Sequence, residues 1–239
     1  MKFKIFSAIL AVVLFTCVCL PAHAANQREE NVEFTQEMLE KIYSNNAKIE
    51  KYIEMKETMP STRATGYTLL DIPPIEQENN SYCGPACAKM AADYLNIRDE
   101  KGRFYTQSKI APIIGCTSST GSYSGDIAAG MNELLESEVY ELANTRNADL
   151  VSSMVYGIDG DYPMFINVKK LPNYSKPVNS GHFILGVGYT FYTQGGSTLM
   201  SDLTYNDPRP GYADQYEITC DEMVEACESK AGNFIRAIP

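Results

Sequence analysis

Cys83 carries the strongest chemical signal in this sequence, because its neighbours predict a thiol at the start of a helix. From Pro85 to Asn96, apolar side chains recur every three to four positions, which is typical of a helix with one buried face. Pro85 suits the first helical position, and Gly84 is expected to allow a sharp turn before it. The free N–H groups and the dipole of a helix N-terminus favour a thiolate, which is a nucleophile.

Gln77 lies six residues before Cys83 and could bring a side-chain amide to the same place. Such an amide can donate a hydrogen bond to an oxygen that becomes negative during acyl transfer. In the simpler interpretation, Cys83 is an ordinary buried cysteine that begins a core helix. An amide donor before the cysteine and Gly-Pro after it favour a cysteine hydrolase.

Two strands are predicted in the last third of the sequence, and they could supply a base. Residues 181–189 alternate apolar side chains on one face with His182 and glycines on the other. Residues 199–207 form the next strand, which Pro208 ends. The glycine-containing stretch 193–197 between them signals a hairpin.

The hairpin register predicts a partner for the histidine. If the turn is centred between Gln194 and Gly195, antiparallel pairing places His182 opposite Asp207, give or take a residue. The Cβ atoms of opposed residues are about 4.5–5.5 Å apart, which allows a carboxylate–imidazole hydrogen bond. Asn206 would point to the other face.

Taken together, these motifs resemble the papain-like superfamily of cysteine peptidases. The likeness is greatest to the double-glycine (bacteriocin-processing) peptidases and their stand-alone secreted relatives, and it covers roughly residues 69–238. It implies an α+β papain-like fold, in which a helical half with the nucleophile helix packs on a twisted antiparallel sheet. The motifs that carry it are Gln77, Tyr82-Cys83-Gly84-Pro85-Ala86, Gly181-His182 and Asn206-Asp207-Pro208 with Gly211.

The resemblance implies a role for each of the four polar residues. Cys83 would be the nucleophile, His182 the base, Asp207 the residue that orients the base, and Gln77 the oxyanion-hole donor. The substrate would be a peptide or protein, and no cofactor is required. The well-studied relatives are fused to membrane-spanning exporters, whereas this sequence has its own export signal.

Three other functions fit the same residues. One is a cell-wall peptide amidase or endopeptidase, against which the spacing from Gln77 to Cys83 argues. Another is a transglutaminase-like acyl transferase, which would accept amines in place of water. The third is a non-catalytic binding module on the same fold. The joint presence of all four polar residues favours an enzyme.

The N-terminus predicts export. Lys2 and Lys4 precede an apolar run over residues 5–20, and a small-x-small site ends at Ala24, so residues 1–24 read as a signal peptide that is cleaved before Ala25. A membrane anchor is the alternative, but the run is shorter than the ~20 residues that a span needs. The protein is therefore expected to be secreted or on the cell surface, without stable membrane insertion.

Residues 25–66 are predicted to form a helical segment and a linker ahead of a peptidase domain at 67–239. Phe34, Met38, Ile42, Ile49 and Ile53 fall on one helical face. This helix either docks on the domain as part of its structure, which is slightly favoured, or acts as a removable inhibitory prosegment. The rest of the chain predicts helices over 107–114 and 126–136, a strand over 164–168 and a turn at 159–161.

Charge and cysteine content limit the partners. Without Lys2 and Lys4, 18 basic residues remain against 30 acidic ones, a net charge of −12 that disfavours nucleic acids and anionic membranes. The exported part has five cysteines, an odd number that predicts a free thiol. If Cys83 is that thiol, up to two disulfides remain possible among Cys87, Cys116, Cys220 and Cys227, although Cys220 and Cys227 are too far apart to pair with each other and Cys87 is expected to be a packed core residue. Only one histidine follows the signal peptide, so no metal site is predicted.

Overall fold

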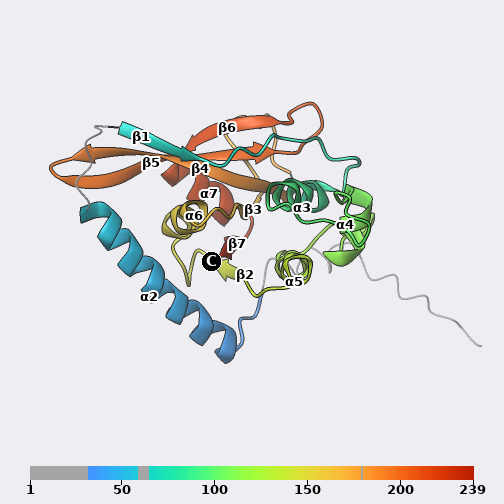
Figure 1. Ribbon diagram of the computed structural model, residues 1–239. Helices are drawn as coiled ribbons and strands as arrows, with labels where there is room; N and C mark the ends of the chain where they lie inside the picture. The colour runs from blue at the N-terminus through green and yellow to red at the C-terminus, as the bar shows by residue number, and fades with distance from the viewer. Residues whose placement is uncertain (1–31, 59–64, 179) are drawn as a thin grey trace, which may run out of the picture.

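A computed structural model describes residues 32–58, 65–178 and 180–239 (Figure 1). The predicted signal peptide at 1–24 and most of the predicted linker lie outside the described residues. The elements are α2 (Gln36–Thr58), β1 (Thr65–Leu69), α3 (Cys83–Tyr94), α4 (Gln107–Ile113), α5 (Ser124–Leu135), β2 (Tyr140–Asn144), α6 (Leu150–Asp159), β3 (Met164–Val168), β4 (His182–Gln194), β5 (Ser197–Asp207), β6 (Asp214–Thr219), α7 (Cys220–Glu228) and β7 (Asn233–Ala237).

The strands form one antiparallel sheet that carries the helices. Its order is β2-β7-β3-β4-β5-β6, and β1 pairs with the second half of β4. The helix α3 packs on β4, α5 packs on β2, and α6 lies against β7 and β4 (Figure 1). The predicted α+β arrangement, with a nucleophile helix packed on an antiparallel sheet, is confirmed.

The nucleophile helix begins two residues earlier than predicted. It starts at Cys83, so Pro85 is its third residue, where an N–H would still lack an intrahelical partner. The first intrahelical bond runs from Ala86 N–H to the Tyr82 carbonyl. Gly84 is helical and makes no sharp turn. A glycine is required there because a Cβ would lie 2.3 Å from Ser122 Oγ.

The predicted hairpin exists, but its register is displaced by two residues. Gln194 pairs with Ser197, so Gly195 and Gly196 alone form the turn, and both have positive φ. Leu185 consequently pairs with Asn206. Asp207 therefore lies diagonally across from His182, still within reach of its side chain.

The helix α2 packs against the domain with its predicted apolar face. Ile42 and Ile49 are buried, and Ile53 is half-buried against the core. Phe34, predicted on the same helical face, lies before the first residue of α2 and is half-buried against the core. Polar contacts add to this packing: the buried Arg236 donates to the Ile42 carbonyl (3.1 Å) and to Asn46 Oδ1 (2.7 Å), four residues further along the helix.

The far end of α2 is held by a second polar cluster. Asp159, at the end of α6, accepts hydrogen bonds from Tyr52 (2.7 Å) and Lys56 (2.6 Å) of α2 and from Tyr189 (2.6 Å) of β4. These contacts join the helix to the sheet at both ends. They fit a structural helix better than a removable one, and the domain boundaries themselves stay predictions.

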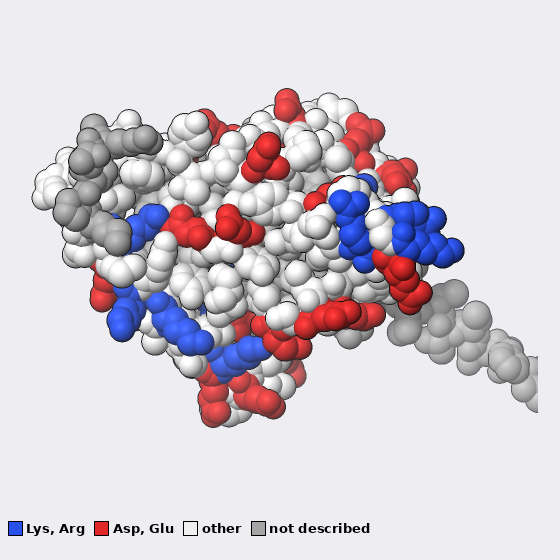
Figure 2. All heavy atoms as spheres, in the orientation of Figure 1, with Lys and Arg blue, Asp and Glu red and all other residues white. Residues whose placement is uncertain are grey.

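All five cysteines that the structure describes are free thiols, so neither possible disulfide is formed. Cys87, Cys116 and Cys227 are buried, as expected for Cys87, whereas Cys83 and Cys220 are partly exposed. Within the three described ranges, no helix is apolar over a length that would span a bilayer, and no three His, Cys, Asp or Glu side chains gather as metal ligands. Figure 2 shows acidic and basic side chains interspersed on one face of the molecule.

Candidate active site

Cys83 is the first residue of α3, and the residue is partly exposed. The side chain is hydrogen-bonded to His182, and the Gly84 and Phe183 backbones also bond to the sulfur. Burial alone would raise the pKa of the Cys83 thiol, but these bonds and the charge of His182 outweigh burial and lower the pKa below its ordinary value of 9.0. The helix N-terminus adds to the same effect.

His182 is the first residue of β4 and is bonded on both sides. Its Nε2 lies 2.7 Å from Asp207 Oδ1, which leaves Nδ1 for Cys83. Burial favours the neutral imidazole, but the bonds and negative charges of Asp207 and Cys83 raise the pKa of His182 to about 9. The neighbouring thiolate and imidazolium therefore stabilise each other near neutral pH.

Asp207 ends β5 and is completely buried. Burial would raise its pKa, but hydrogen bonds from His182, Tyr174 and the Arg209 backbone lower it. The Arg209 N–H donates to Oδ1 (2.9 Å), and the Tyr174 hydroxyl donates to Oδ2 (2.7 Å). The carboxylate thus stays ionised inside the protein. The structure brings Cys83, His182 and Asp207 into one chain of contacts.

Gln77 lies beside this chain, but its amide is turned partly away. Its backbone N–H bonds to the Pro208 carbonyl (2.8 Å), next to Asp207. Its side-chain Nε2 donates to the Asn79 carbonyl (2.6 Å), and its buried Oε1 meets no partner within the described residues. One amide hydrogen remains for another acceptor. The oxyanion role of Gln77 stays a prediction.

Sequence reasoning missed Tyr174 and Arg209. Tyr174 lies in the connection between β3 and β4, away from any motif, and its contact with Asp207 depends on how that connection folds. The Arg209 guanidinium lies over the ring of Tyr174, 4.5 Å from its centroid. Arg209 follows Asp207 by two residues, so a search for donors next to the predicted acid could have found it.

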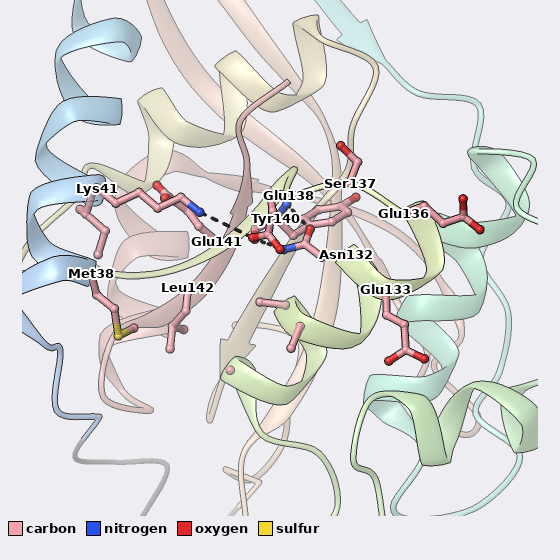
Figure 3. Close-up of a pocket in the computed structure, with 14 residues that line it drawn as sticks. Met38, Lys41, Asn132, Glu133, Glu136, Ser137, Glu138, Tyr140, Glu141 and Leu142 are labelled. Carbon is pink, nitrogen blue, oxygen red and sulfur yellow. Dashed lines mark hydrogen bonds and ion pairs between the residues drawn. The ribbon is translucent and has the colours of Figure 1, made fainter.

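A groove elsewhere on the surface is not part of this site. It has a volume of about 610 Å³ and lies between α2 and α5 at the edge strand β2 (Figure 3). None of Cys83, His182 and Asp207 lines it. Asn132 bonds both backbone groups of Tyr140 there (2.7 and 2.8 Å) and so covers part of the exposed strand edge.

Comparison with known proteins assigns the chain to a family. The model of the Peptidase_C39 like family matches residues 69–233. The chain therefore belongs to this family, and it is a cysteine-type peptidase, as the sequence predicted. No curated protein matches it.

Several solved structures are similar to this one. The peptidase domain of Streptococcus ComA, a bifunctional ABC transporter of a quorum-sensing pathway, has 18% identity and a TM-score of 0.43, over 70% of this chain and 98% of that one. A double-glycine-motif protease from an AMS/PCAT transporter, solved in complex with the leader peptide, has 16% identity and a TM-score of 0.43, over 75% and 97%. The bromelain protease from Ananas comosus, in complex with the E64 inhibitor, has 12% identity and a TM-score of 0.43, over 74% and 99%.

Proposed function

We propose that this protein is a secreted peptidase that cleaves peptide bonds through a thioester on Cys83. The observation that carries the proposal is the chain of contacts from the Cys83 thiol through His182 to the buried Asp207. Secretion rests on the signal-like residues 1–24.

The proposed reaction begins with the thiolate–imidazolium pair. Cys83 Sγ attacks the carbonyl carbon, and the π electrons move to the oxygen, which the Cys83 backbone N–H and the remaining amide hydrogen of Gln77 stabilise. The tetrahedral intermediate then collapses and expels the amine, which takes the proton from His182. The acyl group remains on Cys83 as a thioester.

Hydrolysis of the thioester completes the cycle. His182 removes a proton from water, which attacks the carbonyl carbon and breaks the C–S bond. The acid product leaves, Cys83 is again a thiolate, and His182 keeps the proton that it took from water. Asp207 keeps the imidazole ring in place and stabilises its protonated form throughout.

The nucleophile can be tested without a known substrate. We expect iodoacetamide to label Cys83 faster than every other cysteine, as measured by mass mapping at pH 6 and pH 8. Cys220 is the matched comparison, because it is also partly exposed but burial and nearby carboxylates raise its pKa to about 11. Faster labelling of Cys220 with Cys83 inert in the folded protein would remove Cys83 as the nucleophile.

The reaction is tested with a peptide library that includes cell-wall peptides, read by mass spectrometry of new termini. Cleavage is expected with the parent and with Cys220→Ala, and none with Cys83→Ala. Added methylamine separates hydrolysis from acyl transfer: acid products support a peptidase, whereas methylamides in place of acids would reassign the protein as an acyl transferase. A parent that cleaves nothing but binds library peptides would be a binding module.

A further inference from the structure

Tyr174 is the one side chain, among the described residues, whose hydroxyl bonds to Asp207. It is 5% exposed, and the O–H···Oδ2 distance is 2.7 Å. Because Oδ1 already accepts from His182 Nε2 and the Arg209 N–H, Tyr174 fills the remaining side of the carboxylate. Both oxygens of Asp207 are therefore held by donors from different parts of the chain.

This second bond fixes the direction of the first. A carboxylate can rotate about its terminal side-chain torsion, which has a broad energy profile. With Oδ2 bonded to Tyr174, rotation would break a buried hydrogen bond, so Oδ1 stays directed at His182. The ring of Tyr174 also contacts the His182 ring edge-on, at 6.1 Å between centroids, and helps to keep water from the His182–Asp207 bond.

Tyr174 is itself held in place. Its backbone N–H bonds to the carbonyl of Leu171, whose side chain is fully buried. The Arg209 guanidinium lies over its ring at 4.5 Å and over the Tyr212 ring at 4.7 Å. Since Arg209 also donates its backbone N–H to Asp207, Tyr174, Asp207 and Arg209 form a closed set of contacts behind the histidine.

We propose that Tyr174 is a positioning residue of the peptidase, which acts through Asp207 to hold His182 toward Cys83, with Arg209 supporting it. The proposal rests on the proposed function, but its test does not need a peptide substrate. Reaction of Cys83 with iodoacetamide reports directly on the thiolate that His182 stabilises.

Tyr174→Phe keeps the ring and removes only the hydroxyl. We expect the acid limb of the Cys83 alkylation profile to move to higher pH, because a less firmly held Asp207 stabilises the imidazolium, and with it the thiolate, less well. The other titratable or charged groups near Cys83 and Asp207 are Cys87, Cys116, Tyr205, Tyr216 and Arg209, and they are unchanged in this variant. On a cleaved library peptide, kcat should fall about 10-fold or more with KM nearly constant.

The matched control is Tyr205→Phe. Tyr205 is also buried and near Asp207, but its hydroxyl makes no hydrogen bond to Asp207. This variant should leave the alkylation profile and kcat unchanged. Equal shifts of the alkylation profile in the two variants would overturn the proposal. So would a fall in kcat of Tyr174→Phe that is explained entirely by a lowered Tm, because either result shows a structural role.

A double-mutant cycle tests whether Tyr174 acts through Asp207. In an Asp207→Asn background, Tyr174→Phe should change kcat and the Cys83 alkylation rate by less than about twofold, since the group it acts through is already altered. An additive loss would overturn the proposal. If Tyr174→Phe does not fold, Arg209→Met serves as the second variant. Arg209→Met should move the acid limb of Cys83 alkylation to higher pH, by less than is expected for Tyr174→Phe. An unmoved limb would count against the proposal.

The two proposals can fail separately. If the parent protein cleaves no peptide but Tyr174→Phe still moves the acid limb of Cys83 alkylation, the peptidase proposal fails and the positioning role of Tyr174 stands. If the parent protein cleaves peptides through Cys83 but Tyr174→Phe behaves like Tyr205→Phe, the peptidase proposal stands and the positioning role of Tyr174 fails.

Discussion

Among the described residues, two carboxylates are buried beside a basic side chain, and they differ in what surrounds them. Glu141 accepts from Arg236 Nε (2.7 Å), and the remaining nitrogens of Arg236 bond to Asn46, Ser153 and the Ile42 carbonyl. Asp207 accepts from His182, but nearby Gln77 Oε1 and Arg209 Nη1 are buried without partners within the described residues.

The difference separates a stabilising cluster from a reactive one. Buried polar groups are normally all bonded, so the Arg236 cluster has the arrangement expected where only the fold is at stake. Burial also lowers the pKa of Arg236, but unmet groups and shifts in a nucleophile and its base are what concentrate at functional sites. In the Asp207 cluster, the pKa of His182 is raised to about 9 and that of Cys83 is lowered. Changes to the first cluster should therefore affect folding, and changes to the second should affect reactivity.

Removing α2 should have the largest effect. Deletion of residues 25–64 keeps β1 but exposes the surface that Ile42 and Ile49 cover, and it takes Asn46 and the Ile42 carbonyl away from the buried Arg236. We expect an aggregated or unfolded product, as measured by circular dichroism and size-exclusion chromatography. A folded product that hydrolyses peptides faster than the parent would establish α2 as part of an inhibitory prosegment.

Of the substitutions that contrast these two clusters, Asp207→Asn should have the largest effect on chemistry, with little effect on folding. By comparison with a Ser-His-Asp triad, kcat should fall by up to about 10⁴-fold, since a neutral amide stabilises the imidazolium less than a carboxylate does. Asp207 is also one of the groups that raise the pKa of His182 to about 9, so the alkaline limb of the remaining activity should move to lower pH. A limb that stays near pH 9 would contradict the role of Asp207.

Arg236→Met should test the other cluster. It leaves the Glu141 carboxylate buried without its cation, which costs about 3–5 kcal/mol in the free energy of unfolding, measured by urea titration. Combining it with Glu141→Leu should recover part of that loss, because the unpaired charge is then removed. The pH profile of Cys83 alkylation should be unchanged in the folded fraction. A shifted profile would show that the two clusters are coupled.

The same contrast explains which features the sequence could predict. The Cys83 helix, the strand at 164–168 and the His182–Asp207 contact follow from local patterns, since apolar periodicity, turn glycines and alternation are properties of neighbouring residues. The strands β2 and β7 are buried at every position, as β3 is, but Glu141 and Arg236 interrupt their apolar residues, so neither an apolar run nor alternation marks them. Their charges are compensated only by a partner far away in the sequence.

The tertiary contacts of the site could not be predicted for the same reason. Tyr174 reaches Asp207 across 33 residues through an irregular connection, and the register of β4 and β5 depends on which two residues of the connection form the turn. The helix α6 was also missed. Its Asp149 cap bonds to the Ser152 N–H (2.6 Å), a local signal that the sequence does contain.

The smallest effect, and the closest comparison, concerns two buried glutamines near the same loop. Gln107 is bonded at both of its amide atoms: its Nε2 donates to the Glu76 carbonyl (2.8 Å) and its Oε1 accepts from the Glu78 N–H (2.9 Å). Gln77, between those two residues, has an unmet Oε1 and one uncommitted amide hydrogen. Gln107→Ala should therefore lower stability by about 1–3 kcal/mol, because it leaves buried backbone groups unpaired, and should alter kcat little in the folded protein.

Gln77→Ala should behave in the opposite way. The amide hydrogen matters only when the carbonyl oxygen becomes negative, so kcat should fall by about 10²–10³-fold, with Cys83 alkylation and Tm largely retained. Gln77→Glu should be at least as harmful, because a carboxylate repels the oxyanion and has no N–H to donate. Steady-state hydrolysis of one cleaved library peptide, measured beside Gln107→Ala, separates the two residues. If Gln77→Ala cleaves as fast as the parent, Gln77 is not an oxyanion donor, and its unmet oxygen is a feature of the fold alone.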